Sequence, residues 1–128
     1  MDASCNNTYN EDNKIIYSPN HPRLFPKLKY CTWHIAAPIG FQIRVEPFFY
    51  SIGSGSLKIF DAAKIDYSKS IANLTGIDKY NGTTSQDNNM FFTYGSFGKG
   101  FQGFQVTFSL IGMQIDFIYK RIPNLRII

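Results

Sequence analysis

The sequence has few of the residues on which catalysis and metal binding depend. Among 128 residues there are two cysteines and two histidines. Cys5 and Cys31 lack the CxxC spacing of a redox or zinc site, and no second cysteine pair completes four ligands. Neither His21 nor His34 lies in a nucleophile-and-base pattern, and no carboxylates are spaced as an identifiable acid pair. We therefore expect a non-catalytic protein without a metal or other cofactor.

The chain also lacks long runs of like charge and long apolar runs. The net charge is +4, and the 13 basic residues occur singly or in pairs, which does not favour nucleic-acid binding. Arg23, Lys27 and Lys29 lie close together in the sequence before Cys31 and are a possible contact for a polyanion. No apolar run reaches the ~18 residues of a membrane helix, and the start, MDASCNNTYN, lacks the order of a signal peptide. We expect a mature or excised domain that does not insert into a membrane.

Strand-favouring residues are abundant. The chain has 12 Phe and 8 Tyr, whereas Ala and Glu, which favour helices, are scarce. Its length suits a single domain with one core. Short alternating segments with turns between them predict an all-β protein, an antiparallel β-sandwich. Apolar and polar side chains alternate in residues 31–36, 41–46, 57–60, 90–94 and 104–110.

The order of these segments along the chain predicts their pairing and the connections between them. We expect 31–36 and 41–46 to form a hairpin, and 90–94 to pair with 104–110. Residues 52–56, with two glycines, are expected to be a short turn. Residues 1–14 are interpreted as a polar lead-in, and 62–89 as a long connection with a weakly helical or irregular stretch around 66–74.

The cysteines and the glycosylation sequons indicate a cellular location. We predict a Cys5–Cys31 disulfide, worth roughly 3 to 4 kcal/mol through the loop that it closes; two buried free thiols in a cytosolic protein are the alternative. N-x-T sequons occur at Asn6, Asn73 and Asn81. Together these features favour a glycoprotein that is secreted, or is the extracellular part of a membrane protein.

Several motifs in a fixed order carry a resemblance to a known family. They are Cys5, SPNHP at 18–22, FP at 25–26, CxWxIxAPxG at 31–40, Phe60-Asp61-Ala62 and Gly103-Phe104. Over roughly residues 5 to 111 the chain resembles the CUB domain. The resemblance implies a jelly-roll-like antiparallel sandwich that recognises extracellular proteins or glycans. We expect residues 1–112 to form this domain, and the mixed apolar and charged residues of 113–128 to be an added strand or a linker to a neighbouring domain.

The chain also departs from the family pattern. CUB domains usually carry a second disulfide, but the loop for its first cysteine is shortened to residues 51–55, and Thr75 stands where the second is expected. Many members bind calcium through a tyrosine and three carboxylates. Here the tyrosine position is Phe25, the last carboxylate position is Ser96, and the other two fall in the shortened loop. The resemblance therefore implies that the calcium site is lost.

The leading hypothesis is a recognition module that binds an extracellular protein. One alternative is an accessory domain that locates a secreted protease on its substrate. Another is a domain that binds glycans or glycosaminoglycans through Arg23, Lys27 and Lys29. Asp61 is expected to cap backbone amides, and both histidines are expected to be solvated. The sequence leaves the oligomeric state open. Candidate exposed aromatic contacts are Tyr50, Phe60, Tyr80, Phe91 and Phe97.

Overall fold

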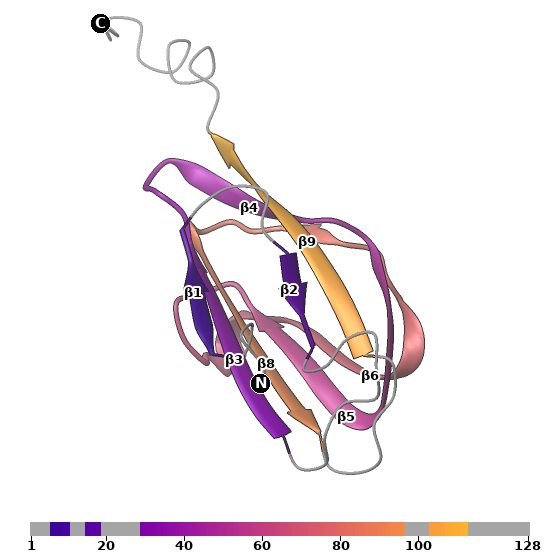
Figure 1. The fold of residues 1–128 in the computed structure, drawn as a ribbon. Coiled ribbons are helices and arrows are strands. Elements are labelled where there is room, and N and C mark those ends of the chain that lie inside the picture. The colour runs from indigo at the N-terminus through magenta and orange to yellow at the C-terminus, as the bar shows by residue number, and fades with distance from the viewer. Residues whose placement is uncertain (1–5, 11–14, 19–28, 97–102, 113–128) are drawn as a thin grey trace, which may run out of the picture.

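The described part of the chain is almost entirely strand. The computed structural model describes residues 6–10, 15–18, 29–96 and 103–112 (Figure 1). Within these ranges the single helical element is a 3-10 turn, which confirms the all-β prediction. The elements are β1 (Asn7–Tyr9), β2 (Ile15–Tyr17), β3 (Lys29–Ala36), β4 (Phe41–Val45), β5 (Phe48–Phe60), η1 (Tyr67–Lys69), β6 (Ser70–Tyr80), β7 (Thr83–Thr84), β8 (Asn89–Ser96) and β9 (Gly103–Gly112).

Two layers form the sandwich, and the long hairpin of β5 and β6 runs through both. In the first layer the strand order is β1, β3, β8 and the second half of β5. In the second layer β2 and β4 flank β9, and β7 pairs with β4. Residues 50–51 of β5 pair with β9, whereas 56–60 pair with β8, so β5 bends from one layer into the other. All pairings are antiparallel except that of β1 with β3.

The core lies between the layers and is built from the predicted alternation. Trp33 on β3 is fully buried, and its ring lies 5.8 Å from that of Phe104 on β9, edge to face. Tyr94 on β8 approaches Phe104 from the same layer as Trp33, at 5.2 Å. Truncating a buried aromatic of this size costs about 3 to 5 kcal/mol. These three rings therefore hold the two layers together.

Both predicted strand pairings are wrong. Strand β3 pairs with β1 and β8, whereas β4 pairs with β9 and β7, so the expected hairpin does not form. After β3 the chain makes a tight turn, closed by a 3.1 Å hydrogen bond from Phe41 N to Pro38 O, and β4 then lies in the other layer, beside β9. Likewise β8 and β9 belong to different layers. Alternation shows which face of a strand is buried but not which strand lies beside it.

Three predicted connections are strands instead. Residues 52–56 continue β5, and a Cβ on Gly55 would lie 2.7 Å from Gly95 O, so glycine there permits close approach to β8. The long connection contains β6, in which exposed and half-buried residues alternate from Ile71 to Ile77. Because the exposed positions include Ile71 and Ile77, this alternation does not appear as an apolar–polar pattern in the sequence. Within the polar lead-in, β1 is held by Asn6 Oδ1, which accepts hydrogen bonds from Thr32 N at 2.9 Å and Thr32 Oγ1 at 3.1 Å.

Candidate partner-binding surface

Asp61 performs the capping role that the sequence predicted. It follows β5, and its Oδ2 accepts a hydrogen bond from Gln86 N at 2.8 Å while Oδ1 accepts one from Asp87 N at 3.2 Å. These bonds fasten the end of β5 to the segment between β7 and β8. A polar cleft of about 680 Å³ opens beside them, lined by residues of η1, β6 and that segment. Because both carboxylate oxygens are occupied by backbone amides, Asp61 is a structural residue.

His34 differs from its prediction. It lies on the outer face of β3 as expected, but it is half-buried: its Nε2 lies 2.9 Å from Asn89 Oδ1, and its ring is 6.1 Å from that of Phe91. The reason is that β8 pairs alongside β3 and brings both residues against the imidazole. His21 lies outside the described residues.

The predicted aromatic contacts are only partly exposed. Tyr50 and Phe60 are buried, so their assignment as exposed contacts is wrong. Tyr50 faces the core beside Phe48, and the exposed Tyr67 of η1 covers Phe60 edge to face at 5.4 Å. Tyr80 and Phe91 are half-buried. Phe97 lies outside the described residues.

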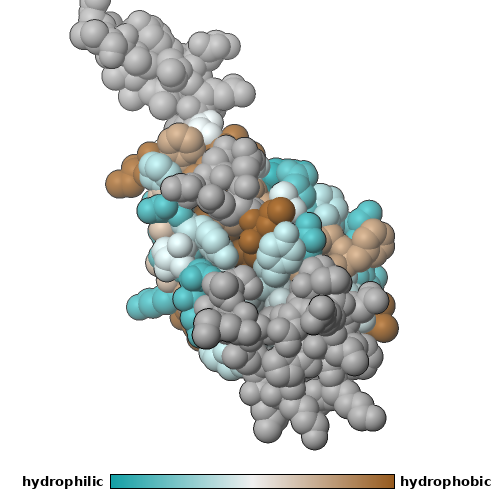
Figure 2. Space-filling model, viewed as in Figure 1, coloured by the Kyte–Doolittle hydropathy of each residue, from teal (hydrophilic) through white to brown (hydrophobic). Residues whose placement is uncertain are grey.

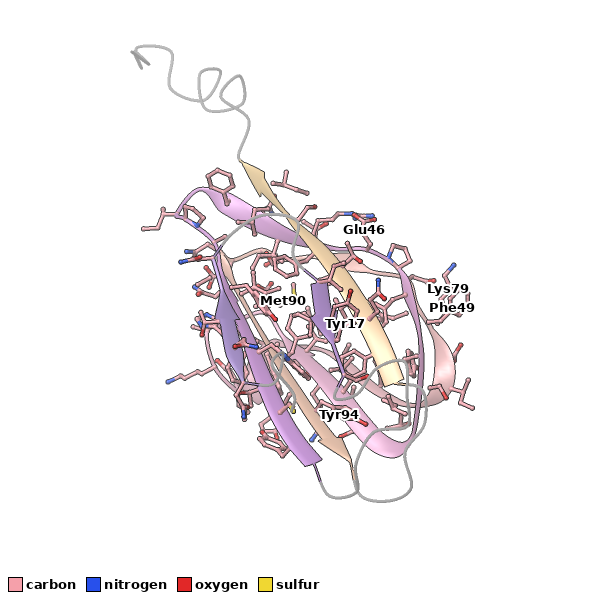
Figure 3. The ribbon with its side chains drawn as sticks, viewed as in Figure 1. Tyr17, Glu46, Phe49, Lys79, Met90 and Tyr94 are labelled. Atoms are coloured by element: carbon pink, nitrogen blue, oxygen red, sulfur yellow. The ribbon has the colours of Figure 1, made fainter. Side chains whose placement is uncertain are left out.

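The most exposed apolar side chains on the β5–β6 hairpin are not among the aromatic contacts predicted from the sequence. Phe49 is 75% exposed and Ile77 is 72% exposed. The register places Phe49 opposite Lys79 and Ser51 opposite Ile77, so these side chains share the outer face of the second layer. Lys79 Nζ lies 5.6 Å from the centroid of the Phe49 ring (Figure 3). We call Phe49, Ile77 and Lys79 the Phe49 surface.

The Phe49 surface lies beside a groove and carries both apolar and charged side chains. It borders a shallow groove of about 440 Å³ lined also by Tyr50, Ser51, Asp78 and Gly103. In Figure 2 apolar, brown atoms lie beside hydrophilic, teal atoms on the side of the molecule where Figure 3 labels Phe49 and Lys79. Exposed aromatic and aliphatic groups rimmed by charge are typical of protein contact sites. The consecutive aromatics 48–50 concealed this site, because their sequence does not show which of them faces the core.

The remaining predicted site residues are partly outside the described ranges. Arg23, Lys27 and Cys5 lie outside them, and the side chain of Lys29 at the start of β3 is likewise not described. Cys31 is fully buried next to Trp33 on the core face of β3. The three sequon residues, Asn6, Asn73 and Asn81, are exposed. The disulfide and the glycans stay predictions.

The donors at the family's calcium positions do not suit that ion. Calcium takes six to eight oxygen ligands with several carboxylates among them. Residues 51–55 lie within β5 and are Ser, Ile, Gly, Ser and Gly, and the other two positions are Phe25 and Ser96. No group of three or more His, Cys, Asp or Glu side chains gathers in the described ranges. The single helical turn among the described residues, η1, is too short to cross a membrane.

An antiparallel sandwich that exposes apolar side chains next to a charged one is typical of binding modules. A family model described as CUB domain matches residues 5–108, and the chain therefore belongs to the CUB domain family. CUB domains are generally non-catalytic modules that mediate protein–protein interactions, and they occur in secreted proteins and in extracellular parts of membrane proteins. The family assignment and the jelly-roll-like sandwich expected from the sequence are confirmed.

Known proteins resemble this chain over different lengths. Embryonic protein UVS.2 of Xenopus laevis is 27% identical over 113 residues, which are 84% of this chain and 22% of that protein. Zinc metalloproteinase nas-39 of Caenorhabditis elegans is 40% identical over 42 residues, 33% of this chain and 4% of that protein. The chain thus spans less than a quarter of either relative's length.

A solved structure shows the same fold. The MASP-1 CUB2 domain, whose structure is described as bound to Ca²⁺, superimposes with a TM-score of 0.71 at 18% sequence identity. The match covers 82% of this chain and 99% of that one. At this identity the likeness concerns the fold alone.

Proposed function

We propose that this domain is an extracellular, non-catalytic recognition module that binds a protein partner through the Phe49 surface. The observation that carries the proposal is the exposure of Phe49 and Ile77 on one sheet face, with Lys79 against the aromatic ring. Large side chains of this kind lose most of their water-exposed area when a partner covers them, and such anchors dominate binding energy. The family's calcium positions carry no carboxylates in this chain, and we therefore assign binding to a surface that does not need the ion.

Lys79 adds a preference for partner chemistry. Its ammonium group lies over the Phe49 ring, so the surface presents a positive charge next to apolar groups. A partner segment with an apolar side chain flanked by a carboxylate would complement both features. Partial desolvation in the complex would strengthen the cation–π contact.

Binding of the labelled, multimerised domain to cells tests the proposal. Phe49→Ser and Ile77→Ser are expected to reduce binding at least tenfold, whereas Tyr67→Ser, also an exposed residue but on η1, should bind as the unaltered domain does. Protease treatment of the cells should abolish binding, and removal of cell-surface glycosaminoglycans should not. Equal binding by the Phe49→Ser and Tyr67→Ser variants would refute the assigned surface. Dependence on glycosaminoglycans alone would favour the glycan-binding alternative.

A second candidate function is that of an accessory domain which locates a secreted protease on its substrate. It is favoured by the similarity to zinc metalloproteinase nas-39. The test is whether the full gene product contains a protease domain beside this one. A protease domain there, together with slower cleavage of a protein substrate when Phe49 is changed to Ser, would support this function. Unchanged cleavage would contradict it.

A further inference from the structure

Strand β6 forms a long edge of the sandwich. It extends over 11 residues and, among the described residues, pairs with β5 alone. An exposed edge offers backbone N–H and C=O groups to any other strand, and proteins usually guard such edges with charges, prolines or bulges. The first eight residues of β6, SIANLTGI, contain no charge and no proline. Charges and prolines are therefore absent from this part of the edge, and the one extra residue in β6 is Ile71, between the pairs Ile59↔Ala72 and Phe60↔Ser70.

Bulges do not supply the missing protection between Ala72 and Ile77. From the pair Ile59↔Ala72 to the pair Ser51↔Ile77, the register shifts place the extra residues in β5, so β6 itself carries none. Gly76, at a φ of +75°, is the one left-handed residue in this stretch. The segment before Gly76 thus keeps a regular, neutral edge, and a strand of the same sequence could pair with it.

A modification sequon stands in the middle of this neutral edge. Asn73 is exposed and is followed by Leu74 and Thr75, which complete the N-x-T pattern. It pairs with Lys58 of β5, whose Nζ lies 5.7 Å from the Tyr67 ring centroid, so the Asn73 side chain lies on the outer face of the first layer at its rim. An N-linked glycan is bulky and strongly hydrated. Attached here, its bulk would cover the outer face beside the edge and hinder the approach of a neighbouring strand.

We propose that a glycan on Asn73 guards this edge and keeps β6 from pairing with β6 of a second copy of the chain. Two neutral edges of identical sequence can pair antiparallel about a two-fold axis without opposing like charges. The proposal rests on the extracellular location, because the glycan is added in the secretory pathway, but not on the Phe49 surface. The sequon at Asn81 follows the end of β6 and should not guard the edge.

Matched variants of the 128-residue chain, secreted from a eukaryotic host, test this role. Asn73→Gln removes the sequon and leaves the edge neutral, whereas Asn73→Lys removes it and adds a charge. Thr75→Ala removes the sequon at another residue, and Thr75→Ser keeps it. Glycopeptide mass spectrometry measures occupancy of Asn73, and light scattering after size exclusion measures the mass at increasing concentration.

The expected pattern distinguishes an edge guard from a general solubilising effect. The unaltered chain, Thr75→Ser, Asn81→Gln and Asn73→Lys should be monomers, and Asn73→Gln and Thr75→Ala should approach twice the protein mass as concentration rises. An unoccupied Asn73 in a monomeric chain, or a monomeric Asn73→Gln at every concentration, overturns the proposal. So does an Asn73→Lys variant that dimerises as Asn73→Gln does. Cell binding by the Asn73→Lys monomer reports separately on the Phe49 surface.

Discussion

Substitution of Ser85 by alanine tests how the segment between β7 and β8 is held to β4. Ser85 is fully buried. Its Oγ accepts a hydrogen bond from Ile43 N at 2.8 Å and donates one to Asp87 O at 2.6 Å. The backbone of Ser85 also donates to Ile43 O at 2.8 Å. Alanine keeps the backbone bond but removes the acceptor of the buried Ile43 amide.

The cost follows from that stranded amide. A buried donor left without its acceptor costs about 1 to 3 kcal/mol. Asp87 is exposed, so water can replace the hydroxyl at its carbonyl, and this second loss adds little. We expect Ser85→Ala to lower the free energy of unfolding by about 2 kcal/mol, which is roughly 6 to 10 °C in Tm for a domain of this size.

Chemical denaturation monitored by Trp33 fluorescence measures the effect. The midpoint should fall while the slope of the free energy against denaturant stays unchanged. Ser68→Ala is the matched control, because Ser68 is exposed and its Oγ donates to Asp66 Oδ1 at 2.6 Å on the surface. That variant should change the unfolding free energy by less than about 0.5 kcal/mol. Equal losses in the two variants would refute the reasoning from burial.

Three further predictions concern β5, η1 and the cysteines. Gly55→Ala should destabilise the domain by about 1 to 3 kcal/mol in thermal unfolding, because its Cβ would lie 2.7 Å from Gly95 O; unchanged Tm would contradict this. The hydrogen bond from the Ser68 hydroxyl lowers the pKa of Asp66 in the folded protein. The ionised Asp66 carboxylate therefore contributes its full stabilisation above the unfolded-state pKa, and this stabilisation disappears as pH falls through the lower folded-state pKa. In an NMR titration, Ser68→Ala should raise that pKa. Reduction of the predicted Cys5–Cys31 disulfide should lower the free energy of unfolding, measured by denaturation, by roughly 3 to 4 kcal/mol. Free thiols found by alkylation of the native protein would contradict the predicted disulfide.

The candidate surface could be predicted less well than the fold. Phe49 stands between Phe48 and Tyr50, and three consecutive aromatics contain no polar residue to mark the outward face. Its neighbours Ile77 and Lys79 lie in the segment 62–89, whose sequence predicts a connection and not a strand. They join Phe49 because β6 pairs with β5, a contact between residues about thirty positions apart along the chain. The capping role of Asp61 was predictable, since a short polar side chain after a strand commonly binds nearby backbone amides.

The sequence by itself determined the family, the all-β class and the inward faces of the clearest strands. The alternation around Trp33 and along 104–110 placed the core rings correctly, because the period of two is a local property of an extended chain. Only the tertiary structure decided that β3 and β4 lie in different layers, that β5 bends between them and that Phe49 meets Lys79. These arrangements depend on contacts between distant segments and on the turn at Pro38, which local patterns do not encode.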